Sequence, residues 1–80
     1  MERRLVYLGS IEKAIAFITA LGKVEASASL ISGWRTVNAK SVLGVLSLDL
    51  DKILILEISG SKKTIDLAEH AVGSYIIAKG

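Results

Sequence analysis

A strand that runs directly into a short capped helix is the pattern that most constrains this chain, and it occupies residues 36–48. Apolar and polar side chains alternate over residues 36–39, which is typical of an extended segment. Ser41 follows in the position of a helix N-cap, where its hydroxyl can accept a hydrogen bond from a backbone N–H two or three residues later. The apolar residues after the cap are too dense for one buried face of a helix of about two turns. We therefore expect Leu43 and Leu46 to stay at the surface.

The pattern leaves two interpretations of this segment open. A short connector helix that packs into the core is the more common outcome. The alternative is a docking patch, because exposed leucines beside a polar cap offer an apolar surface to a protein partner.

The composition requires a fold that is held together by packing. The chain has 80 residues, 51% of them hydrophobic, with no cysteine and no proline. This length suffices for one modest core, so we expect a single domain over residues 1–80. The lack of cysteine excludes disulfides and thiolate metal sites, and we expect no metal and no cofactor. It is also compatible with a cytoplasmic protein, and no apolar run is long enough for a signal peptide or a membrane span.

The net charge of +2 is mild and does not by itself indicate a nucleic-acid surface. The basic residues are scattered, and the four aromatic residues do not alternate with them. A small nucleic-acid-binding domain that uses Trp34 and the basic residues is a remaining alternative, and it predicts weak, salt-sensitive binding to DNA or RNA.

The N-terminal segment predicts a strand followed by a long helix. We expect a strand over residues 3–8 and a helix from residue 11 capped by Ser10. The apolar stripe of this helix comprises Ile11, Ala14, Ile15, Ile18 and Leu21. Phe17 falls beside the stripe, at the edge of the core or exposed. Gly22 stands where a helix can end with a residue of positive φ.

Residues 24–39 predict a β-hairpin. Apolar residues alternate with polar residues over 24–30, which is the clearest strand pattern in the chain. A turn signal at Ser32 and Gly33 leads to a partner strand over residues 34–39.

The C-terminal half predicts one more strand and one more long helix. The strand spans residues 53–59, with Leu54, Leu56 and Ile58 on one face. Ser61 is a candidate N-cap for the helix that follows. The apolar stripe of this helix runs nearly to the end of the chain and comprises Ile65, Ala68, Val72, Tyr75 and Ile76.

This order of elements, β-α-β-β-α-β-α, predicts an α+β fold built as an open-faced two-layer sandwich. Two long helices with one apolar face each pack most economically on the same side of a single four-stranded sheet. A ferredoxin-like arrangement is the competing topology, because it also places two helices on one face of four strands. The additional short helix favours the first arrangement.

Residues 36–48 resemble the signature of HPr, the small phosphocarrier of the bacterial phosphoenolpyruvate-dependent sugar phosphotransferase system. The signature reads T-V-N-x-K-S, two apolar residues, Gly, two apolar residues and S-L, and the segment fits it throughout. The resemblance extends more weakly over nearly the whole chain. It implies an antiparallel sheet and the HPr order of elements, which is the order that the patterns predict.

The resemblance also implies where phosphocarrier chemistry would lie. In HPr a histidine before the first helix, in the loop G-I-H-A-R-P, accepts the phosphoryl group. An ungapped alignment from Ser41 places Ser10 at that position, and residues 8–13 contain no His, Arg or Pro. Glu12, near the arginine position, would repel a phosphate. We therefore expect Ser10 to be a helix cap, no residue to be catalytic, and His70 to be a partly exposed residue of the last helix.

A second site of the family is present in this sequence. The serine of the K-S pair in HPr is phosphorylated by a dedicated kinase, and the resemblance implies the same role for Ser41. A phosphate there would lie at a helix N-terminus, where charge and backbone N–H groups tolerate it. The resemblance further implies a hydrophobic contact patch for partners at Val42, Leu43 and Leu46. Lys40 and Arg35 are weaker candidates, for contacts with an acidic partner.

The resemblance leads to the hypothesis of a regulatory, non-phosphotransferring and non-enzymatic HPr-like protein. Its logic is similar to that of Crh, an HPr paralogue that lacks the histidine, keeps the serine and acts in carbon catabolite regulation. We expect a cytoplasmic protein whose partners belong to the phosphotransferase system or to catabolite control. The alternatives are a working phosphocarrier with an atypical acceptor, and a homodimer that pairs through apolar outer positions such as Ile53 and Ile55.

Overall fold

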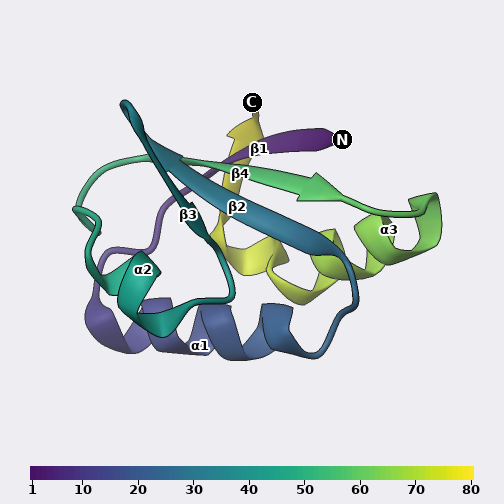
Figure 1. Cartoon of the computed structure of the whole chain (residues 1–80), viewed down its shortest axis with the longest axis horizontal. Coiled ribbons are helices and arrows are strands. Elements are labelled where there is room, and N and C mark those ends of the chain that lie inside the picture. Colours follow the sequence, from purple (N-terminus) through teal and green to yellow (C-terminus); the bar gives the residue numbers. More distant parts are fainter.

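Five strands form one antiparallel sheet in the order β3-β2-β4-β1-β5, and all three α-helices lie on one of its faces (Figure 1). The computed structural model describes residues 1–80. The strands are β1 (Glu2–Val6), β2 (Ser27–Ser32), β3 (Arg35–Asn38), β4 (Leu54–Ser59) and β5 (Ile76–Lys79). The helices are α1 (Ile11–Gly22), α2 (Val42–Leu46), α3 (Lys62–Ala71) and the 3₁₀ helix η1 (Gly73–Tyr75). The predicted open-faced α+β sandwich is therefore confirmed, and no helix has the length and apolar character that a membrane span requires.

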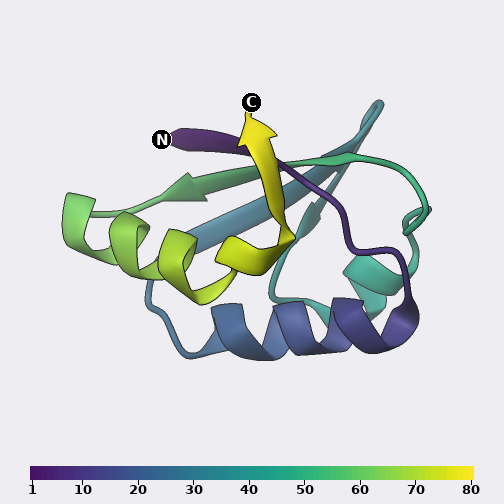
Figure 2. The ribbon, with the colours of Figure 1, turned by 180° about the vertical axis from the view of Figure 1, so that it is seen from behind.

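The sheet has five strands rather than the four predicted. The last helix was expected to run nearly to the end of the chain, but α3 ends at Ala71 and is followed by η1 and β5 (Figure 2). β5 pairs antiparallel with β1, with Lys79 opposite Arg4. Gly73 weakens a helix at this point, and the β-branched residues that follow favour a strand. The helical spacing of Val72 and Tyr75 persists because the backbone N–H of Tyr75 bonds the carbonyl of Val72 across the 3₁₀ turn, at 3.0 Å.

The core lies between the sheet and the helices, and all of its buried residues are apolar. Leu54, Leu56 and Ile58 of β4 are each 0% exposed, which confirms the predicted inner face of this strand. Because side chains alternate across a strand, the positions between them face away from the helices. No buried side-chain nitrogen or oxygen lacks a hydrogen-bond partner.

The buried face of α1 differs from the prediction. The buried residues recur at i, i+3, i+4 and i+7, and they are Ala14, Phe17, Ile18 and Leu21. Phe17 is fully buried, and its ring meets that of Tyr75 edge to face with 5.4 Å between centroids. Ile11 and Ile15 are 61% and 44% exposed, so their predicted place in the core was wrong. The two stripes share three residues, and burial of the large aromatic ring decides between them.

Positive φ angles occur at three turns, and none of them ends α1. Gly9 (84°), Gly33 (60°) and Gly60 (150°) adopt these angles. Gly22, which was predicted to stop the helix in this way, is instead its last helical residue, and Lys23 caps the helix in the right-handed region. The predicted hairpin turn at Gly33 is confirmed.

Candidate functional site

The segment that carries the HPr signature folds as edge strand β3 followed by α2. Ser41 is the N-cap of α2, and its Oγ accepts a hydrogen bond from the backbone N–H of Gly44 at 3.1 Å. Gly44 packs closely here, since an added Cβ would lie 3.2 Å from both this Oγ and the Cβ of Val37. The half-buried cap is therefore held between strand and helix, and only the solvent side of Oγ has room for an added group.

α2 presents one strongly exposed leucine beside this cap. Leu43 is 85% exposed and Val42 is 46% exposed, whereas Val45 is fully buried in the core. Leu46 is partly buried and packs against the core. The predicted surface position is thus confirmed for Leu43. The side chain of Leu46 is only partly exposed, because it also packs against the core.

The exposed isoleucines of α1 lie on the side of that helix that faces α2. Lys13 lines a hollow with Tyr75 and Ile77, on the η1–β5 side of α1. Ile11 and Ile15 project from the opposite side of the helix, because residues two apart in a helix differ by about 200°. α2 contacts α1 and lies on this second side, opposite β5 (Figures 1 and 2).

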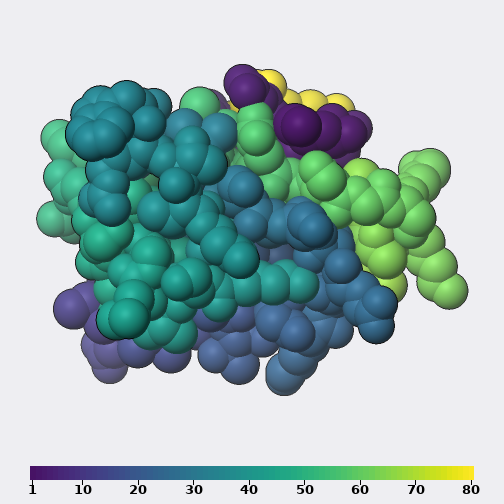
Figure 3. All heavy atoms as spheres, viewed as in Figure 1, coloured from purple at the N-terminus to yellow at the C-terminus, as the bar shows by residue number.

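These apolar side chains define one surface, which we call the α1–α2 surface: Ile11, Ile15, Val42 and Leu43. In the space-filling view the β3–α2 segment, in teal, lies against α1 on the face toward the viewer (Figure 3). The sequence pattern predicted core positions for Ile11 and Ile15 and gave no sign that they belong to this surface. The signal that could have found them is the alternative stripe through Phe17, which leaves both isoleucines outside the core.

The two cations near Ser41 are both engaged in hydrogen bonds with the protein. The Lys40 ammonium donates to the backbone carbonyl of Val24. The Arg35 guanidinium donates to the carbonyl of Ser47 at 3.0 Å and to its Oγ at 2.8 Å, and thereby ties the hairpin to the C-terminal end of α2. The structure therefore directs both charges away from the Ser41 hydroxyl.

We expect Arg35→Ala to loosen α2 without unfolding the protein. The variant loses two hydrogen bonds from a charged donor at a partly exposed site, which should lower the free energy of unfolding by about 1 kcal/mol. Amide hydrogen exchange should accelerate mainly at Val45 and Ser47, whose N–H groups bond within α2. Equal acceleration in the distant helix α3 would contradict this local role.

The N-terminus of α1 is organised by Gly9 and Ser10. The Oγ of Ser10 accepts a hydrogen bond from the backbone N–H of Lys13 at 3.1 Å, which confirms the predicted cap. The backbone N–H of Gly9 donates to the carbonyl of Leu50 at 2.9 Å and so joins this turn to the segment before β4. Glu12 occupies the first turn of the helix.

The only histidine lies at the other end of α1. His70 is an exposed residue of α3 and lines a hollow with Lys23 and Val24, which follow α1. The twelve residues of α1 span about 18 Å at 1.5 Å per residue, so His70 and Ser10 are separated by roughly the length of this helix. No group of three His, Cys, Asp or Glu residues is placed to hold a metal ion.

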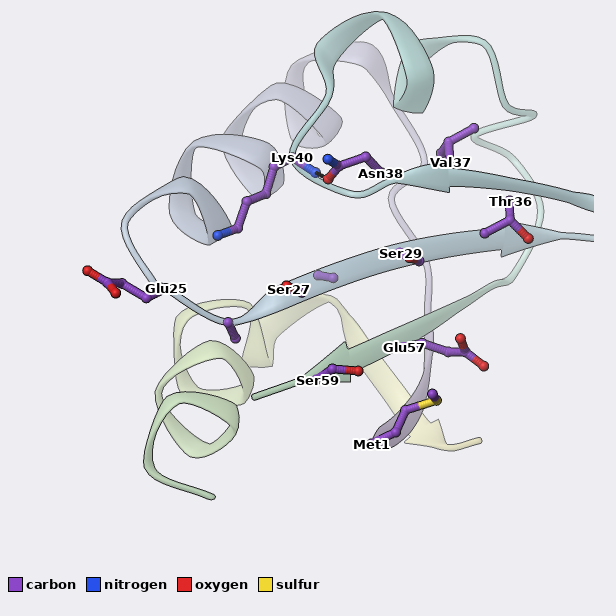
Figure 4. A pocket seen from close by; sticks show the side chains of 12 residues that line it. Met1, Glu25, Ser27, Ser29, Thr36, Val37, Asn38, Lys40, Glu57 and Ser59 are labelled. Carbon is purple, nitrogen blue, oxygen red and sulfur yellow. Dashed lines mark hydrogen bonds between the residues drawn. The ribbon is translucent and has the colours of Figure 1, made fainter. Parts of the chain in front are cut away.

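A polar hollow of about 500 Å³ lies on the outer face of the sheet (Figure 4). Hydroxyl and amide side chains from three neighbouring strands line it, among them Ser27, Ser29, Asn38 and Ser59. Lys40 reaches across one end of the hollow toward the start of β2 (Figure 4). This hollow is separate from the α1–α2 surface, which lies on the helical side of the molecule.

An open sheet with its helices on one side, and a capped short helix beside the first long one, define an open-faced α+β sandwich. Solved structures place the chain more narrowly, as an HPr fold. HPr-C-His from Thermoanaerobacter tengcongensis superposes with a TM-score of 0.73 and 19% identity, covering 92% of this chain and 93% of that one. The phosphocarrier protein HPr from Bacillus anthracis gives a TM-score of 0.71 and 19% identity, with 91% and 94% covered.

Crh, the catabolite repression protein of Bacillus subtilis, has the same fold. It superposes with a TM-score of 0.59 and 19% identity, covering 92% of this chain and 88% of Crh, whose own structure is a swapped, intertwined dimer. No family model matches the sequence, and no curated protein matches it. The likeness therefore establishes the fold.

Proposed function

We propose that this chain is a regulatory, protein-binding relative of HPr that does not relay phosphate through a histidine. One observation carries the proposal. Ser10, at the position that the resemblance gives to the phosphocarrier histidine, caps α1, and the only histidine lies at the other end of that helix. A serine phosphate ester is too stable for rapid relay between proteins, whereas a phosphoimidazole is labile. The partner is a protein of the phosphotransferase system or of catabolite control, in the cytoplasm.

The α1–α2 surface supports a docking role. Its four side chains are 44–85% exposed, and two of them, Val42 and Leu43, directly follow the Ser41 cap. Exposed apolar side chains gathered beside a rigid polar feature are typical of protein–protein contact sites. Lys40 and Leu46 flank this surface as secondary contacts.

Ser41 is the switch in this proposal. A phosphate adds a charge of about −1.5 to −2 beside Val42 and Leu43. Because the Lys40 and Arg35 side chains are bonded to Val24 and Ser47, neither is placed to neutralise that charge within the molecule. The phosphate charge therefore stays unneutralised at the binding surface. It disfavours binding of an apolar or acidic partner surface and favours binding of a basic one.

Phosphorylation followed by intact mass and site mapping tests the proposal. The protein is incubated with ATP and an HPr kinase, and separately with phosphoenolpyruvate and the first enzyme of the phosphotransferase system. We expect label from ATP alone, on Ser41, and none on Ser41→Ala. Loss of the cap costs about 1 kcal/mol, so the matched controls are Ser10→Ala and Ser61→Ala, whose hydroxyls cap α1 and α3 with the same 3.1 Å geometry.

The other outcomes contradict the proposal in different ways. Label that persists on Ser41→Ala refutes the assignment of the switch. Acid-labile label from phosphoenolpyruvate instead supports a working phosphocarrier with an atypical acceptor.

A further inference from the structure

The outer face of the sheet carries an apolar row that crosses four of the five strands and ends at the polar Thr36 of β3. Leu5 of β1 lies directly opposite Ala78 of β5 on one side and Ile55 of β4 on the other. Ile55 is in turn opposite Ile31 of β2, which is opposite Thr36 of β3. These side chains alternate with core residues such as Leu54 and Leu56, so they point away from the core. The helices all lie on the other side of the sheet (Figure 1).

One further isoleucine extends this row. Ile53 directly precedes β4, continues its alternation and is 58% exposed. We call the set the open-face patch: Leu5, Ile31, Ile53, Ile55 and Ala78. It contains no charged side chain, and no helix of the chain covers it.

We propose that the open-face patch is the interface of a homodimer, in which two copies pack their sheets face to face. This is the aligned packing of a β-sandwich, in which two apolar sheet faces lie about 10 Å apart. The interface would be isologous, because the same patch serves both copies.

The charges beside the patch favour a second copy as the occupant. The next row on the outer face pairs Arg3 of β1 with Glu57 of β4, whose side chains form a salt bridge at 2.5 Å. The patch is neutral, and the row next to it carries one charge of each sign, so this part of the face offers nothing specific to a strongly charged partner. A two-fold related copy brings the same pair in reverse order, so that Arg3 of one copy can face Glu57 of the other.

The dimensions predict a weak dimer. Five strands side by side span about 24 Å across the sheet. Taken as a flat surface, the whole face therefore has an area on the order of 500 Å² per copy. This is below the roughly 800 Å² per partner of a standard stable interface. The two edge strands, β3 and β5, have only four residues each and give less scope for edge-to-edge pairing.

Sedimentation equilibrium from micromolar to millimolar concentrations tests this proposal. We expect reversible monomer–dimer exchange, and NMR dilution shifts confined to outer-face residues of β1, β2, β4 and β5. Ile53→Lys should raise the dimer Kd at least about tenfold, because a buried unpaired ammonium opposes association. Since Ile53 is already 58% exposed, the variant monomer should fold normally by circular dichroism.

Leu43→Lys is the matched control, because Leu43 is 85% exposed on the helical side of the molecule. It should leave the dimer Kd unchanged. The dimer proposal is therefore tested independently of the proposal that the α1–α2 surface binds a partner. A protein that stays monomeric at millimolar concentration overturns the proposal. A dimer that survives Ile53→Lys, such as an intertwined one, or dilution shifts on the helical side also overturns it.

Discussion

Phe17→Ala is expected to lower the free energy of unfolding by about 3–5 kcal/mol, the range for truncation of a fully buried aromatic side chain. Phe17 is 0% exposed and makes an edge-to-face contact with Tyr75, which follows α3. The substitution therefore leaves a cavity between α1 and the C-terminal segment. Small domains are stable by only about 5–15 kcal/mol, so a large part of the total stability is lost. Urea titration followed by circular dichroism measures the effect, since Trp34 is 92% exposed and reports little on the core.

Ile15→Ala is the matched control on the same helix. Ile15 is 44% exposed, and alanine has the higher helix propensity, so the net cost should stay below about 1 kcal/mol. If Ile15→Ala were as destabilising as Phe17→Ala, α1 would bury the predicted stripe with Ile15 and not the face with Phe17. The same variant removes one apolar side chain from the α1–α2 surface and should weaken partner binding while leaving the fold intact.

Gly9→Ala is expected to destabilise the protein by about 1–3 kcal/mol. Gly9 has φ of +84°, where a Cβ is unfavourable, and an added Cβ would lie 2.8 Å from Cε2 of the Tyr7 ring. The partly exposed ring can move, so the backbone strain is the larger cost. Thermal unfolding should show a lower Tm by several degrees for each kcal/mol lost. The hydrogen bond from Gly9 to Leu50 ties this turn to the segment before β4, so faster exchange is also expected at that amide.

Gly22→Ala is the control for the glycine substitution. Gly22 is helical, has no positive φ, and nothing lies within 4 Å of an added Cβ. Alanine should therefore stabilise the protein by up to about 1 kcal/mol through its helix propensity and the reduced entropy of the unfolded chain. Destabilisation here would indicate that Gly22 ends the helix in the left-handed region after all.

The α1–α2 surface was only partly predictable. The cap at Ser41 and the exposure of Leu43 follow from local chemistry, because a hydroxyl at an N-cap and an overcrowded apolar helix are both visible within a few residues. Ile11 and Ile15 could not be placed on the surface from their spacing, since the same spacing is compatible with burial. The engagement of Lys40 by Val24 depends on a contact across sixteen residues. The role of Ser41 as a switch stays a prediction.

The sequence by itself determined the class of the fold, the three serine caps, the hairpin turn and the inner face of β4. Each of these depends on interactions within one element or one turn. Leu54, Leu56 and Ile58 alternate along one strand, and each capping hydroxyl accepts a hydrogen bond from the backbone N–H three residues later. The tertiary structure decided the rotation of α1 and the conversion of the last residues into β5. Both depend on partners far along the chain, because the Phe17 ring is buried against Tyr75 and β5 exists only through its pairing with β1. Local periodicity shows which faces could be buried, and long-range contacts select the one that is.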